Sequence, residues 1–275
     1  MFRYRPRRLL RRLLTGAALA LAGLPAWAQN FDDVLSARML TGWRMADGSH
    51  MAAVQLDLAA GWHTYWRAPG DAGIPTLIDT RGSRNLHRSA IVWPRPQVYM
   101  QNGFRSIGYE GRVILPLKIT PQTRGADVVF TARIDLGVCK DICIPQTLNV
   151  TATLPASGGA RDARIAAALA DLPYTGAEAG ARNVTCTMTP TQDGIAVTAR
   201  FEMAPLGGSE AVVIETGDPL HWVSTPKSRR SGNVVTASSE VQHVEGAPLS
   251  IKRKAITISV IGRGEAVEIH GCARG

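Results

Sequence analysis

The sequence predicts an all-β protein in which two β domains are joined by a short helical linker. Apolar and polar residues alternate along most of the chain, which is typical of strands with one buried face. The alternation stops once, at residues 155–159, and an alanine-rich stretch with helical spacing follows before it resumes.

Residues 1–28 have the pattern of a secretory signal peptide. Six arginines and no acid fill residues 1–12, an apolar run follows to about Leu24, and Ala26 and Ala28 precede Gln29. We expect export to the periplasm with cleavage near Ala28, although the arginine pairs leave the twin-arginine route open beside the general one. The apolar run is shorter than the roughly 20 residues of a membrane span, and no later stretch approaches that length, so we expect no stable span.

Removal of this segment changes the charge of the protein. The formal net charge of +9 loses six arginines and becomes 9 − 6 = +3 for residues 29–275. A nucleic-acid-binding surface needs clustered basic residues interleaved with aromatic ones, whereas the remaining lysines and arginines are scattered among acids. The composition therefore predicts no nucleic-acid partner.

Residues 29–155 are expected to form the first β domain. Every second residue is apolar in the stretches 113–119, 130–138 and 148–154, which predicts half-buried strands. Between the last two stretches, Cys139 to Pro145 is expected to connect an antiparallel hairpin. Pro145 supports this, because a residue that precedes proline is disfavoured in the helical conformation.

The linker is expected over residues 156–181 and the second β domain over residues 182–275. A helix is predicted from Ala160 to Leu172, since Ile165, Leu169 and Leu172 fall on one face and Pro173 ends it. Strands are predicted at six places beyond it, namely 184–188, 195–201, 211–214, 234–237, 255–261 and 266–269.

The chain has four cysteines, and their spacing suggests two different pairs. In the chain-entropy model a bridge from Cys186 to Cys272 contributes about 4.5 kcal/mol, whereas one from Cys139 to Cys143 contributes about 2 kcal/mol. We therefore expect a structural disulfide between the distant cysteines and a labile, reducible one between the near cysteines. A plain hairpin disulfide at the near pair and two free thiols at the distant pair are the alternatives.

A metal site is the other chemistry open to two close thiols. A structural zinc site needs four nitrogen or sulfur ligands, usually as two short pairs, but the sequence has one such pair and no histidine in its hairpin. His63 is expected to be a strand residue. A copper(I) site formed by Cys139, Cys143 and Met100 stays open, because these ligands are soft. We otherwise expect no metal and no cofactor.

Three motifs in chain order carry a resemblance to a known family. They are Gly61-Trp62-His63-Thr64-Tyr65-Trp66-Arg67-Ala68-Pro69-Gly70-Asp71, Ser106-Ile107-Gly108-Tyr109-Glu110-Gly111 and the cysteine hairpin. Together they resemble the N-terminal periplasmic domain of the DsbD-type thiol:disulfide interchange reductases, in the stand-alone, ScsB-like variety. The resemblance covers residues from about 45 to 155 and implies an immunoglobulin-like β-sandwich.

The resemblance also implies a function as a protein-disulfide reductase component. The Cys139/Cys143 pair would accept electrons from a membrane-embedded thiol reductase and pass them to thioredoxin-like periplasmic proteins, with Cys143 attacking and Cys139 resolving the mixed disulfide. The chain departs from the best-known members in two ways: three residues instead of five separate the cysteines, and no membrane or thioredoxin domain follows. We therefore expect the electrons to come from a separate protein.

Five more residues are expected around the cysteines. Asn102-Gly103 predicts a tight hairpin turn, and Tyr99, Met100 and Phe104 near its tip correspond to a flap that shields the cysteines in the family. Tyr65 and Trp66 are carried over as walls of the site, although Trp66 also fits a core position. Two other classes of function compete with the relay: a non-catalytic adaptor of two β domains with structural disulfides only, and a copper(I) carrier.

Overall fold

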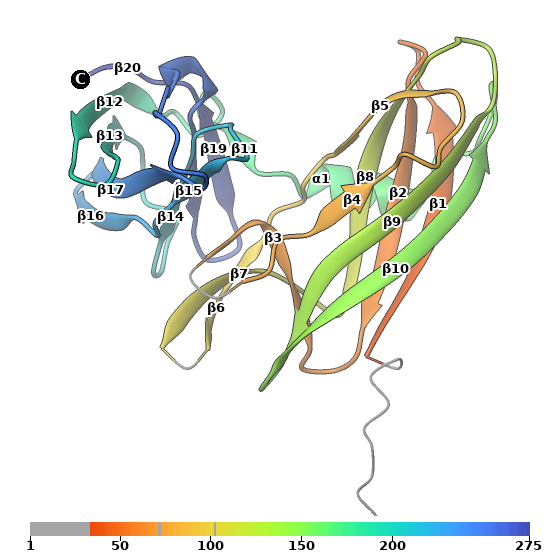
Figure 1. Cartoon of the computed structure of the whole chain (residues 1–275), viewed down its shortest axis with the longest axis horizontal. Helices are drawn as coiled ribbons and strands as arrows, with labels where there is room; N and C mark the ends of the chain where they lie inside the picture. Colours follow the sequence, from red (N-terminus) through yellow and green to blue (C-terminus); the bar gives the residue numbers. More distant parts are fainter. Residues whose placement is uncertain (1–33, 71–72, 102) are drawn as a thin grey trace, which may run out of the picture. The chain divides into compact units, whose positions relative to one another are not determined.

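The computed structural model describes residues 34–70, 73–101 and 103–275, and the predicted signal peptide lies outside the described residues. The fold is all-β, as predicted: an immunoglobulin-like β-sandwich is followed by a short helix and a second β domain (Figure 1). Residues 32–275 belong to one compact unit. The exact domain limits of 155/156 and 181/182 stay predictions.

The N-terminal β region consists of two antiparallel sheets. The first has the order β1-β2-β8-β5, and the second has the order β10-β9-β3-β7-β6, with β4 paired to β9. The strands of the first sheet are β1 (Leu35–Arg44), β2 (His50–Leu58), β8 (Arg112–Pro121) and β5 (Leu86–Ile91). Those of the second are β10 (Cys143–Leu154), β9 (Val128–Cys139), β3 (His63–Gly70), β7 (Phe104–Glu110), β6 (Gln97–Gln101) and β4 (Leu77–Asp79).

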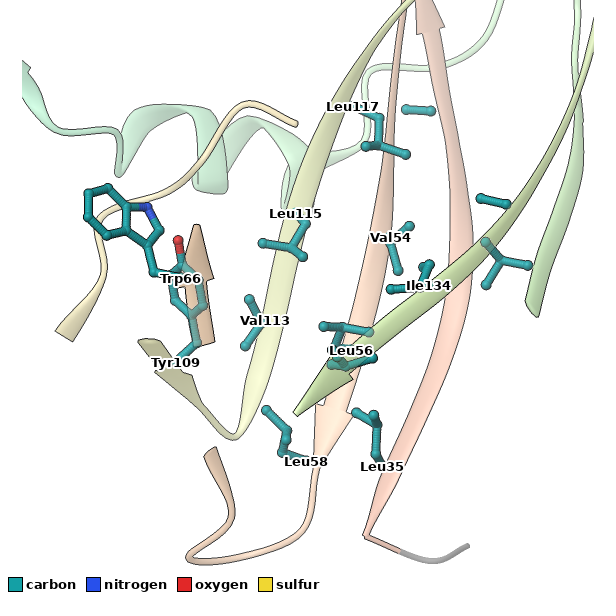
Figure 2. Packing of buried hydrophobic residues seen from close by; sticks show 14 of the residues in the cluster. Leu35, Val54, Leu56, Leu58, Trp66, Tyr109, Val113, Leu115, Leu117 and Ile134 are labelled. Atoms are coloured by element: carbon teal, nitrogen blue, oxygen red, sulfur yellow. The ribbon is translucent and has the colours of Figure 1, made fainter. Parts of the chain in front are cut away.

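The predicted apolar faces of these strands form the core between the two sheets. Leu115 and Leu117 of β8 and Ile134 of β9 are almost completely buried, and Figure 2 shows them in one cluster with the apolar residues of β2. Trp66 and Tyr109 belong to the same cluster and come from β3 and β7. Burial of this large apolar area is the main favourable contribution to the folding of the region.

The helix α1 (Ala163–Ala170) is shorter at both ends than predicted. Asp162 caps its start, because its side chain accepts a hydrogen bond of 2.9 Å from the Arg164 backbone N–H. Ile165 is fully buried against Met51 and Ala53 of β2. These two residues lie on the opposite face of the strand from Ala52 and Val54, which belong to the core between the sheets. The helical linker therefore packs on the outer face of the first sheet.

The C-terminal β region also has two sheets, with the orders β11-β19-β18-β14 and β15-β17-β13-β12-β20, and β16 pairs with β17. All six predicted strands occur: β12 (Arg182–Pro190), β13 (Ile195–Glu202), β14 (Ala211–Glu215), β17 (Val234–His243), β18 (Thr257–Ile261) and β19 (Ala266–His270). Four further strands were not predicted: β11 (Tyr174–Thr175), β15 (His221–Val223), β16 (Lys227–Ser231) and β20 (Ala273–Arg274). A separate apolar core fills this region.

Candidate functional site

The near cysteines lie at the end of the β9–β10 hairpin. Cys139 is the last residue of β9, Cys143 is the first of β10, and the two are directly paired across the strands with their Cα atoms 4.1 Å apart. A disulfide joins them. The connection is thus only residues 140–142, shorter than the predicted 139–145. Cys139 is fully buried, whereas Cys143 is exposed, so one sulfur-bearing residue of the pair faces solvent.

Pro145 lies within β10 rather than in the connection, and the pairing explains why. A short Cα–Cα distance is typical of the non-hydrogen-bonded pairs of an antiparallel ladder, and such pairs alternate along a strand. Pro145, two residues after Cys143 and opposite Gly137, therefore directs its backbone nitrogen away from β9. Because β10 is an edge strand, the missing N–H removes no ladder hydrogen bond.

Tyr65 contacts both sulfur atoms. Its Oη lies 2.7 Å from Cys139 Sγ, to which it donates a hydrogen bond, and 3.3 Å from Cys143 Sγ. The pairing of β3 with β9 brings it there, with His63 opposite Cys139 and Thr64 opposite Val138. Burial raises the pKa of the Tyr65 hydroxyl, so the group stays protonated and remains a donor at neutral pH.

His63 lies between Tyr65 and Tyr99. Its ring meets Tyr65 edge to face at a centroid distance of 5.5 Å and stacks on Tyr99 at 5.2 Å. Burial lowers the pKa of His63, and the nearby charge of Glu110 offsets this only in part, so the imidazole is favoured in its neutral form. Three rings therefore connect the disulfide to strand β6, on which Tyr99 lies.

The predicted flap residues occupy different environments. Strands β6 and β7 form the expected hairpin, with two residues between Gln101 and Phe104. Tyr99 is half-buried against His63, whereas Met100 and Phe104 are 71% and 55% exposed. Trp66 is completely buried in the core, where the guanidinium carbon of Arg67 lies 4.1 Å from the centroid of its ring.

The segment after β3 supplies two contacts that sequence reasoning missed. A Cβ atom added to Gly137 would lie 2.7 Å from Ile74 Cβ, and one added to Gly73 would lie 2.7 Å from Tyr65 Cδ1. Gly73 and Ile74 therefore pack directly on Tyr65 and on the strand that leads to Cys139. A glycine inside a strand, as at Gly137, is the signal that could have indicated this close approach.

The distant cysteines form the second disulfide. Cys186 of β12 is fully buried, Cys272 is half-buried just before β20, and their Cα atoms are 5.6 Å apart. The bond joins residues separated by 86 positions in the sequence. It lies beside the short parallel pairing of β12 with β20 and so attaches the end of the chain to the sheet.

The described part of the chain contains neither a cluster of metal-binding side chains nor a membrane-spanning helix. No three His, Cys, Asp or Glu side chains within it are grouped closely enough to hold a metal ion. Within the same residues, no helix combines the length and the apolar character needed to cross a bilayer.

Comparison with known proteins shows what the N-terminal β region is similar to. Residues 33–155 match the family model described as thiol:disulfide interchange protein DsbD, N-terminal. The crystal structure of the N-terminal periplasmic domain of ScsB from Proteus mirabilis superimposes with a TM-score of 0.60 at 16% identity, covering 88% of this chain and 92% of that one. At this identity the structural match shows a shared fold, and it extends over both β regions. Among curated proteins, none matches this sequence.

Proposed function

We propose that residues 33–155, which match the DsbD N-terminal family, relay reducing equivalents from a membrane-embedded thiol reductase to thioredoxin-like proteins of the periplasm. The observation that carries this proposal is the position of the Cys139–Cys143 disulfide: it lies at a hairpin end, with Cys143 exposed and Tyr65 in contact with both sulfurs. Export by the signal peptide of residues 1–28 would bring the chain to that compartment.

In the proposed reaction the reduced chain starts with two thiols. The Cys143 thiolate attacks one sulfur of the partner's disulfide, which forms a mixed disulfide and releases the partner's other sulfur as a thiolate. The Cys139 thiolate then attacks Cys143 Sγ, closes the Cys139–Cys143 bond and releases the partner's second sulfur. Two electrons pass to the partner, and its thiols take up the two protons. Reduction of the chain by the membrane protein follows the same steps in reverse.

Exposure supports the assignment of the attacking role to Cys143. A partner's disulfide can reach this residue from solvent, whereas Cys139 is completely buried and suits the resolving role. Tyr65 supports the chemistry, because a hydroxyl that donates to sulfur binds a thiolate more strongly than a thiol. Tyr65 would thus lower the pKa of the thiol to which it donates, which is Cys139 in the disulfide form, and so favour the resolving step.

The β6–β7 hairpin would act as the shield. Tyr99 holds one side of it against His63, while Met100 and Phe104 leave apolar surface exposed near the turn. A partner that binds these apolar side chains could move the hairpin, and Tyr99 would then leave His63 and open that side of Tyr65.

The test is a mixed-disulfide trap in cells. Cys139→Ala removes the resolving thiol, so a covalent complex through Cys143 should accumulate and be released by a reductant. A matched control is Cys186→Ala, which frees the half-buried Cys272 instead and should give no such complex. Mass spectrometry of the trapped band identifies the partner.

Two outcomes would contradict the proposal. One is the absence of any trapped thioredoxin-like protein with Cys139→Ala. The other is a thiol-labelling titration of the wild type in which Cys139 and Cys143 resist reduction as strongly as Cys186 and Cys272, because a hairpin disulfide with a purely structural role would behave in this way.

A further inference from the structure

We propose that the C-terminal β region positions Tyr65 for thiol–disulfide exchange, and that it does so through Arg67. Arg67 lies on β3 two residues after Tyr65, and its guanidinium binds two carboxylates of the C-terminal region. Arg67 is thus a positioning residue that acts through Tyr65. The inference deepens the proposed function, because it gives the second β region a part in the chemistry of the near cysteines.

The Arg67 cluster consists of Arg67, Glu215 of β14 and Glu268 of β19. Arg67 Nε and Nη2 each lie 2.9 Å from an oxygen of Glu215, and Nη2 lies 2.6 Å from Glu268 Oε1. The three side chains are only 18–24% exposed. Burial alone would lower the pKa of Arg67, but the bond to Glu215 and the two carboxylate charges outweigh it and raise the pKa, so the ion pairs persist. Two-pronged pairs of this kind fix orientation as well as distance.

Strand β3 needs such a contact because its pairing with β7 is interrupted just after Tyr65. Tyr65 pairs with Gly108, but the next pair is Gly70 with Ser106. The residues from Trp66 to Pro69 therefore face a single residue of β7, and bulges of this kind leave strand residues without ladder partners. Pairing of β3 with β9 has already ended at Thr64.

Two side chains hold this unpaired segment. Trp66 is buried in the core, where Figure 2 shows it beside Tyr109, and Arg67 lies over the Trp66 ring while it binds the two glutamates. Gly73 and Ile74 cover Tyr65 and Gly137. Tyr65 thus lies between the unpaired residues 66–69, which Arg67 anchors, and the covering residues Gly73 and Ile74.

Loss of the Arg67 cluster should loosen Tyr65 and weaken its contact with the sulfurs. Because Tyr65 favours a thiolate over a disulfide sulfur, the Cys139–Cys143 equilibrium should then shift toward the disulfide. The expected shift is roughly threefold to tenfold in the equilibrium constant, the size of one lost hydrogen bond. The thiol pKa of the reduced pair should rise in parallel.

The experiment measures the equilibrium of Cys139–Cys143 with glutathione, and the pH dependence of thiol alkylation, in the full chain. Arg67→Gln and the double variant Glu215→Gln, Glu268→Gln should both shift the equilibrium toward the disulfide and raise the thiol pKa. The double variant is the more decisive test, since both its substitutions lie in the C-terminal β region and leave β3 unchanged. Glu268→Gln alone keeps the bonds of Arg67 to Glu215, so it should retain the fold and give a smaller shift in the same direction.

Arg230→Gln is the matched control. Arg230 pairs with Glu210 at 2.6 Å with side chains 19% and 12% exposed, but both residues belong to the C-terminal region. This variant loses an equally buried ion pair and should leave the near disulfide unchanged. An equal shift in Arg230→Gln, or no shift in Glu268→Gln and the folded double variant, would overturn the inference. Because glutathione replaces the biological partner, either result is independent of whether the trap succeeds.

Discussion

The two disulfides of this chain differ in the length of chain that they enclose and in their exposure to solvent. Cys139–Cys143 spans 4 positions and lies at the end of a hairpin that the β9–β10 pairing already closes, while Cys186–Cys272 spans 86 positions and attaches the end of the chain to β12. The first adds little constraint to the unfolded chain and has one exposed cysteine, Cys143; the second adds much, and neither of its cysteines is exposed. The difference predicts that the near disulfide can be opened without loss of the fold around it.

The largest expected effect is on stability and falls on the distant pair. Replacing Cys186 and Cys272 together by alanine should lower the free energy of unfolding by about 4.5 kcal/mol, whereas the same change at Cys139 and Cys143 should lower it by about 2 kcal/mol, because the unfolded chain regains a far longer loop in the first case. Urea denaturation of the two double variants and the wild type measures this. Equal losses, or a larger loss at the near pair, would remove the distinction between a structural and a working disulfide.

An intermediate effect is expected at Tyr65. Tyr65→Phe removes only the hydroxyl that touches both sulfurs, so the thiol pKa of the reduced pair should rise by up to about 1 unit and alkylation at neutral pH should slow accordingly. The matched control is Tyr109→Phe, which removes a buried hydroxyl bonded to the Pro94 carbonyl at 2.8 Å. That variant should lose stability and leave the thiol pKa unchanged; a shift in both variants would refute a specific role of Tyr65.

The smallest effect concerns pH and the N-terminal region. Burial lowers the pKa values of His50 and His63 from 6.5, so below that pH the unfolded chain binds protons that the folded chain does not. The free energy of unfolding should therefore be highest above pH 6.5 and should fall as the pH decreases toward the folded-state pKa values of the two histidines. Urea midpoints measured across this interval should decline, and His63→Gln should make the decline shallower. A midpoint that is constant over the interval would contradict the burial argument.

Much of the fold could be predicted from the sequence because burial on one face imposes a period of two. The stretches 113–119, 130–138 and 148–154 carry this period and lie in β8, β9 and β10. Strand β16 was missed because its five residues, Lys-Ser-Arg-Arg-Ser, contain no apolar side chain, and β11 and β20 are too short to show a period. Their pairing depends on neighbouring strands that a local pattern does not reveal.

The candidate site could be predicted from the sequence only where the residue types themselves indicate the chemistry. The cysteine pair and Tyr65 follow from the motifs and meet in the structure. His63 was expected only as a strand residue, since its stacking on Tyr99 depends on how β3, β7 and β6 pair. The contact of Ile74 with Gly137 joins a segment without periodicity to a distant strand. The bulge in β3 that lets Arg67 bind the two glutamates cannot be recognised in the local sequence.

The position of Pro145 on the free edge of β10 limits how another protein can engage the near cysteines. A partner strand that extended the sheet alongside β10 would need the outward N–H groups of this edge, and proline offers none two residues from Cys143. Sheet extension is therefore disfavoured beside Cys143, and the same proline disfavours pairing of this edge with a second copy of the chain. In the proposed exchange a partner would instead dock through side chains around the hairpin end, so that recognition would depend on surface shape rather than on backbone hydrogen bonds.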